Sequence, residues 1–236
     1  MSNPGEMSWD LRAQKMLSYS VGCGASKLAR SLNAFQMYWH VQGMKTLYQG
    51  KIIFNGEEFE VSPKMSYGYQ DKNWGTDYTN PWVWLNCNNF TSQATGQKLA
   101  LTSLDLGGAR AVLFGVPLQS TVVVAFYHEG QLYEFSFSKI WLSPRQRFDI
   151  KVTEKEVIWN IVAWNVKAKI EIYFTCPKKT MQFINYENPD GEKKHKELWN
   201  GNYASGTVKL YRRAGNDFEL IDIFEGELGG CEYGVY

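Results

Sequence analysis

Residues 166–174 alternate strictly between apolar and polar side chains, and this alternation constrains the fold more than any other feature of the chain. Apolar residues from Val166 to Phe174 are separated by Lys167, Lys169, Glu171 and Tyr173. A period of two is typical of a β-strand with one buried and one solvated face. Similar patterns occupy residues 148–153 and 157–163, so several such strands are expected in succession.

Turn sequences between apolar runs predict how these strands connect. Asn55-Gly56 supplies two residues that tolerate positive φ, so residues 50–61 are expected to form a type I′ hairpin. Further hairpins are predicted around residues 128–131 and 215–217. Many short strands joined by hairpins predict an all-β chain that closes into an antiparallel barrel. The only helical pattern covers residues 25–38, where a short N-terminal helix is expected.

Composition excludes several functional classes. Lys and Arg number 25 against 24 Asp and Glu, which gives a net charge of +1 and no overall field to attract nucleic acid. No apolar run approaches the roughly 20 residues of a membrane-spanning helix. Residues 1–10 lack a signal-peptide pattern, so a cytoplasmic protein is expected.

The ligands of a metal site are also not evident in the sequence. The four cysteines are widely scattered and are expected to be reduced, buried thiols rather than a disulfide framework. The three histidines have no metal-ligand spacing, so neither a metal nor another cofactor is predicted. Residues 192–197 form a charge run that is expected to be a solvated loop.

The most unusual stretch is Ser66–Asn89, which is expected to contain two strands. In the first, Tyr67, Tyr69, Asp71 and Asn73 share one face. The second places two indoles and two carboxamides on one face (Trp82, Trp84, Asn86, Asn88) and ordinary core residues on the other (Val83, Leu85, Cys87). Aromatic walls with a few polar groups are typical of a ligand pocket. The alternative is an aromatic strand pair held by a structural hydrogen-bond network.

Other chemistry-bearing residues are more isolated. His40 follows Trp39 in an aromatic strand and fits either a core histidine or a site residue. Glu134 lies between Tyr133 and Phe135, where it is either an outward charge or a buried acid.

These residues resemble the signature of the tocopherol cyclase family. Ser66-Tyr67, Asp71-Lys72-Asn73-Trp74-Gly75, Trp82-Val83-Trp84 and Cys87-Asn88 are similar to the family pattern Ser-Tyr-x-Glu-Lys-Asn-Trp-Gly followed by Trp-Phe-Trp-Val-Gln-Cys-Asn. The similarity runs from about Trp39 to Phe137. The chain departs from the pattern in having Asp71 for Glu, one extra residue at Tyr69-Gln70, Asn86 for Gln, and a displaced Pro81.

The resemblance implies paired lipocalin-like domains. Residues 1–60 would be the end of an N-terminal domain, and residues 61–236 a C-terminal lipocalin-like barrel. It also implies a cyclase, an intramolecular lyase or isomerase, whose acid protonates the alkene of a prenylated quinol. The hydrophobic quinol would be the partner, and the oligomeric state is left open.

The resemblance nominates individual residues for this reaction. Asp71 is the expected acid and Glu134 the reserve, while Tyr67, Tyr69 and Asn73 orient the acid or the quinol hydroxyl. Further substrate-binding candidates are Trp39, His40, Lys72, Trp74, Trp82, Trp84, Asn86 and Asn88. A non-catalytic binder of a hydrophobic molecule on the same scaffold is one alternative. A structural or carbohydrate-binding β-domain with exposed tryptophans is another.

Overall fold

A computed structural model describes residues 5–19, 30–110, 112–137, 139–184, 186–187, 191 and 197–235. Almost all of the described elements are antiparallel strands, which confirms the predicted fold class. They form two large sheets and a short hairpin of β9 (Val112–Leu113) and β10 (Val116–Pro117). No helix among the described residues is long and apolar enough to cross a membrane.

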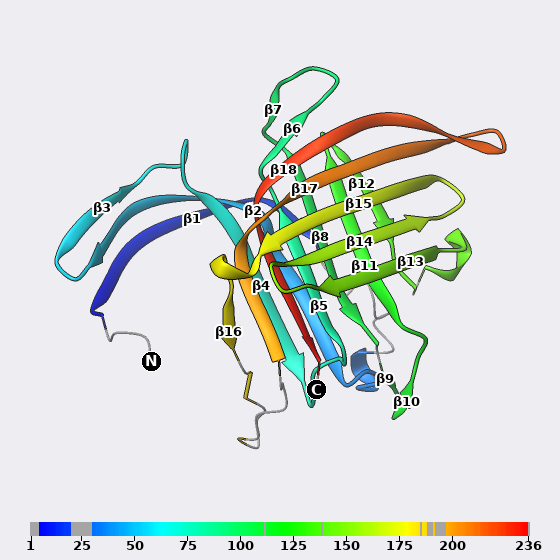
Figure 1. The fold of residues 1–236 in the computed structure, drawn as a ribbon, viewed down its shortest axis with the longest axis horizontal. Coiled ribbons are helices and arrows are strands. Elements are labelled where there is room, and N and C mark those ends of the chain that lie inside the picture. Colours follow the sequence, from blue (N-terminus) through cyan, green and yellow to red (C-terminus); the bar gives the residue numbers. More distant parts are fainter. Residues whose placement is uncertain are drawn as a thin grey trace.

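The first sheet contains β1 (Met7–Tyr19), β2 (Met37–Phe54), β3 (Glu57–Val61) and β4 (Tyr67–Gly75). The long strand β2 pairs with β1 on one side and with both β3 and β4 on the other. The turn between β2 and β3 has φ of 50° at Asn55 and 84° at Gly56, which confirms the predicted type I′ hairpin. Figure 1 shows β1, β2 and β3 extending together away from the body of the molecule.

The second sheet is a curled half-barrel. Its main path runs in the order β12, β11, β8, β5, β18, β17, β15, β14, β13. These strands are β5 (Trp82–Cys87), β8 (Thr102–Ala109), β11 (Thr121–His128), β12 (Gln131–Phe135), β13 (Arg145–Val152), β14 (Glu156–Trp164), β15 (Ala168–Pro177), β17 (Glu197–Ala214) and β18 (Asp217–Val235). The short strands β6 (Phe90–Ser92), β7 (Lys98–Leu99) and β16 (Gln182–Ile184) attach to this path. The structure also contains two short 3-10 turns, η2 (Ile140–Leu142) and η3 (Lys178–Thr180).

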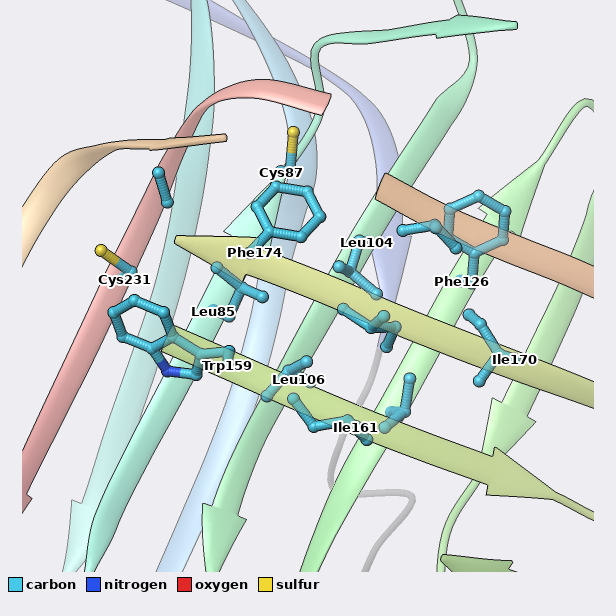
Figure 2. Close-up of a cluster of buried hydrophobic side chains, with 14 of the residues drawn as sticks. Leu85, Cys87, Leu104, Leu106, Phe126, Trp159, Ile161, Ile170, Phe174 and Cys231 are labelled. Atoms are coloured by element: carbon cyan, nitrogen blue, oxygen red, sulfur yellow. The ribbon is translucent and has the colours of Figure 1, made fainter. Parts of the chain in front are cut away.

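The interior of the curled sheet is filled by side chains. The predicted alternation of β15 is confirmed, because Ala168, Ile170, Ile172, Phe174 and Cys176 are buried while their neighbours are not. Figures 1 and 2 show β14 and β15 crossing over β5, β8 and β11, with Trp159, Phe174, Leu85 and Leu106 between them. The concave face is therefore a packed core, as in small barrels whose interiors hold only side chains.

The first sheet packs on the opposite, outer face of the second sheet. Leu17, Val41 and Met44 of the first sheet form a second apolar cluster with Val123 and Ala125 of β11. Residues of β11 therefore alternate between the two clusters, so that both faces of this strand are buried.

The predicted N-terminal helix is not confirmed. Residues 25–29 lie outside the described part, Arg30 and Ser31 have helical backbone, and the chain turns before β2 begins at Met37. Tyr38 lies opposite Trp74 of β4, and their rings stack with centroids 5.6 Å apart. Such cross-strand aromatic pairs favour the extended backbone and override a loosely spaced helical pattern.

The cysteine prediction is confirmed for Cys87, Cys176 and Cys231, which are free and buried. Cys23 and most of the charge run, residues 192–196, lie outside the described residues. The division of the chain at residue 60 stays a prediction. Strand β4, which follows that boundary, pairs with β2, which precedes it.

Candidate functional site

A small cavity of about 190 Å³ lies where β4 of the first sheet meets β5 and β18 of the second. It is lined by Tyr69, Asp71, Asn73, Tyr78, Trp82, Trp84, Tyr186 and Glu232. The predicted core face of β5 is confirmed, because Val83, Leu85 and Cys87 belong to the interior cluster. Trp82 and Trp84 consequently face outward, toward the first sheet and the cavity.

The cavity brings together the residues that the sequence places on one face of each strand. Tyr69, Asp71 and Asn73 come from β4, and Trp82 and Trp84 come from β5. The Tyr69 and Trp84 rings lie 5.3 Å apart. Strand alternation explains this grouping, since every second residue of β4 points toward the second sheet.

Asp71 lies at the solvent side of the cavity. Its Oδ2 accepts a hydrogen bond of 2.7 Å from Trp39 Nε1. Partial burial raises the pKa of Asp71, while the neighbouring Trp39, Tyr69 and Asn73 side chains oppose the increase. The Trp39 ring packs on Gly107, where an added Cβ would lie 2.8 Å from the indole. Glycine at this position therefore leaves room for the indole whose N–H donates to Asp71.

Glu232 supplies a second carboxyl from β18 and is only 6% exposed. It accepts hydrogen bonds from Trp82 Nε1 at 2.5 Å, from the Tyr186 hydroxyl at 2.6 Å, and from the Asn200 amide. Burial raises the pKa of Glu232 despite these donors, and the charge of Asp71 adds to the increase. Tyr78 stacks on Tyr186, and both rings line the cavity.

A third carboxyl, Asp105 of β8, lies behind Tyr69 and is 1% exposed. Its Oδ2 is 3.1 Å from the Tyr69 hydroxyl, and its Oδ1 has no partner among the described residues. Burial raises the pKa of Asp105 well above its ordinary value, and the charge of Asp71 adds to the increase. None of the described groups that act on this pKa is a cation.

Asn86, Asn88 and Tyr67 lie outside the cavity lining. The hydrogen bonds of Asn88 and Tyr67 join the two sheets, whereas that of Asn86 lies within the second sheet. Asn86 donates to the Leu104 carbonyl, and Asn88 donates to the carbonyls of Met44 and Gly68. The Tyr67 hydroxyl donates to Asn89. The structural hydrogen-bond network considered as an alternative is therefore present, next to the cavity.

The remaining candidates lie elsewhere. Lys72 and Trp74 occupy the other face of β4, where Trp74 is 41% exposed and lines a separate cavity. His40 is half-buried and lies opposite Lys72 in the β2–β4 register. Glu134 is buried and forms an ion pair with Lys139, lining another cavity.

Sequence reasoning missed Tyr78, Tyr186, Glu232 and Asp105. Asp105 lies between Leu104 and Leu106, and Glu232 lies between Cys231 and Tyr233. An acid in an otherwise apolar strand was recognised as a signal at Glu134, and the same signal marks these two positions. Tyr78 and Tyr186 have no comparable signal, because isolated tyrosines are frequent throughout the chain.

The raised pKa of Asp105 makes stability depend on pH. Below its ordinary value of 3.8 the side chain is protonated whether the protein is folded or unfolded. As the pH rises, the unfolded state ionises first, so the wild type loses up to about 1.4 kcal/mol of stability per pH unit until the folded pKa is reached. Asp105→Asn lacks this loss, and its stability advantage should grow with pH in urea unfolding. Parallel pH profiles for the two proteins would contradict the assignment of a protonated Asp105.

Comparison with known proteins gives one consistent result. The family model described as "Tocopherol cyclase-like" matches residues 3–235. "Probable tocopherol cyclase, chloroplastic" of Oryza sativa subsp. japonica is 36% identical over 101 residues, and "Tocopherol cyclase, chloroplastic" of Zea mays is 34% identical over 101 residues. Each match covers 43% of this chain and 20% of the relative, so the matched region spans a fifth of these relatives' length. No solved structure matches the chain significantly.

Proposed function

The chain belongs to the tocopherol cyclase-like family, and we propose on this basis that it closes an oxygen-containing ring on a prenylated quinol by acid catalysis. The observation that carries the proposal is the cavity beside β4. It combines a carboxyl of raised pKa, Asp71, with the indoles of Trp82 and Trp84. The reaction requires a carboxylic acid that can donate a proton and aromatic faces that attract a cation.

The reaction begins with proton transfer from Asp71 to the alkene of the prenyl chain. A C–H bond forms, the Asp71 O–H bond breaks, and a tertiary carbocation develops beside Trp82 and Trp84. The quinol oxygen then forms a C–O bond to the cationic carbon and releases its proton to the Asp71 carboxylate. The proton count is unchanged, so the reaction is an isomerisation and Asp71 is ready for another cycle.

The other end of the cavity suits the polar ring of the quinol. Glu232, Tyr78 and Tyr186 provide an acceptor and aromatic surfaces there. Tyr69 and Asn73 lie on the same strand face as Asp71 and orient either the acid or the quinol hydroxyl. Trp39 holds Asp71 through its N–H group.

The proposal is tested by incubating the purified chain with a methylated, prenylated benzoquinol under anaerobic conditions. Chromanol formation, followed by liquid chromatography and mass spectrometry, is the expected result. Heat-denatured protein controls for spontaneous cyclisation. If the quinol binds and is recovered unchanged, the chain is a binder and the proposed reaction is wrong.

A further inference from the structure

Tyr69 lines the cavity together with the proposed acid, Asp71, whereas its partner Asp105 lies outside the cavity lining. Asp105 is almost completely buried, and the Tyr69 hydroxyl is its hydrogen-bond partner. The other carboxyl oxygen, Oδ1, has no partner in the described part of the chain. The neighbouring donors, Tyr69 and Trp84, are both neutral, and they only partly oppose the effect of burial on the Asp105 pKa. A buried carboxylate without a cationic partner is costly, whereas a neutral carboxylic acid is tolerated.

The protonation state of Asp105 decides the direction of its bond with Tyr69. An ionised Asp105 can only accept a hydrogen bond, so the Tyr69 O–H would have to point toward it. A protonated Asp105 carries one O–H donor and can donate to the phenol oxygen across the same 3.1 Å. The Tyr69 O–H is then free to point in another direction.

Asp71 lines the same cavity as Tyr69. Tyr69 acts on Asp71 as a hydrogen-bonding group that lowers its pKa, and Asp71 and Asp105 both raise the pKa of Tyr69. The phenol hydroxyl is thus placed to interact with both carboxyls. Strand alternation fixes this arrangement, because Tyr69 and Asp71 are adjacent on one face of β4.

We propose that neutral Asp105 is a positioning residue that turns the Tyr69 hydroxyl toward Asp71. The inference rests on the proposed function, in which Asp71 gives its proton to the substrate. The negative charge that develops on Asp71 then meets two donors, Trp39 N–H and Tyr69 O–H. Donors oriented in advance toward a developing charge lower the barrier to its formation, and a chain of hydrogen bonds strengthens each member.

Substitutions at Asp105 separate a neutral donor from a charged group. Asp105→Asn supplies an N–H donor to the Tyr69 oxygen, as a protonated Asp105 does, whereas Asp105→Leu keeps a similar volume and supplies none. Asp105→Leu is expected to lower kcat roughly tenfold to a hundredfold with KM little changed. Tyr69→Phe should lower kcat to a similar extent, and Asp105→Asn should lower kcat much less. Circular dichroism verifies that each variant is folded.

Infrared spectroscopy provides a readout that does not depend on turnover. The difference spectrum of wild type against Asp105→Asn at neutral pH should contain the band of a protonated carboxyl group, and Tyr69→Phe should shift that band. Absence of the band overturns the inference whatever the activity, as does an Asp105→Leu enzyme that keeps its kcat. If the band is present but the wild type does not cyclise the quinol, the proposed function fails and the protonation of Asp105 stands.

Discussion

Asp71→Asn is expected to lower kcat for quinol cyclisation by about a hundredfold or more, the range typical of losing a general acid. The amide keeps the size of the side chain and can still accept the Trp39 hydrogen bond, so the cavity should be preserved. It cannot deliver a proton to an alkene. Quinol binding, followed by quenching of tryptophan fluorescence, should therefore change little while turnover is lost.

Two further variants make this result specific. Asp149→Asn removes an exposed carboxyl of β13 and should leave kcat unchanged. Asp71→Glu restores the residue found in the family pattern and should keep part of the activity. Full activity in Asp71→Asn would show that another group supplies the proton, with Glu232 as the next candidate in the cavity.

Phe174→Ala is expected to reduce the free energy of unfolding by about 3–5 kcal/mol, the usual loss for a large aromatic side chain in a packed core. Phe174 is 0% exposed and packs edge-on against Phe90, while the backbone at Gly226 also approaches its ring. Urea unfolding measures the loss. Tyr173→Ala is the matched control on the same strand. Tyr173 is 49% exposed, so its truncation should change the free energy of unfolding little.

Phe174→Ala also tests where the ligand binds. The interior of the curled sheet is filled, so quinol affinity should be nearly unchanged in Phe174→Ala under conditions where the protein remains folded. The candidate cavity lies on the outer face of the sheet, against β4. A small loss of stability combined with a large change in affinity would instead identify the interior as ligand space.

The sequence was most reliable where side chains repeat with the period of the strand. It identified the buried face of β15, the hairpin at Asn55-Gly56 and the core face of β5. It also placed Tyr69, Asp71 and Asn73 on one face and Trp82 and Trp84 on another, and these faces meet in the cavity. The expected helix at residues 25–38 was not confirmed: residues 25–29 lie outside the described part, and the end of the range, Met37 and Tyr38, pairs with β4 as a strand.

The sequence by itself therefore determined the strand faces and the part of the cavity formed by Tyr69, Asp71, Asn73, Trp82 and Trp84. Only the tertiary structure showed that Tyr78, Tyr186 and Glu232 complete the cavity and that Asp105 contacts Tyr69. Strand β5 pairs with β8 on one side and with β18 on the other. This order places Asp105 and Glu232 beside Trp84 and Trp82, although Glu232 lies far along the chain. Alternation decides which face a side chain occupies, but the choice of neighbouring strand depends on how the whole sheet curls to bury its core, and no local pattern records that choice.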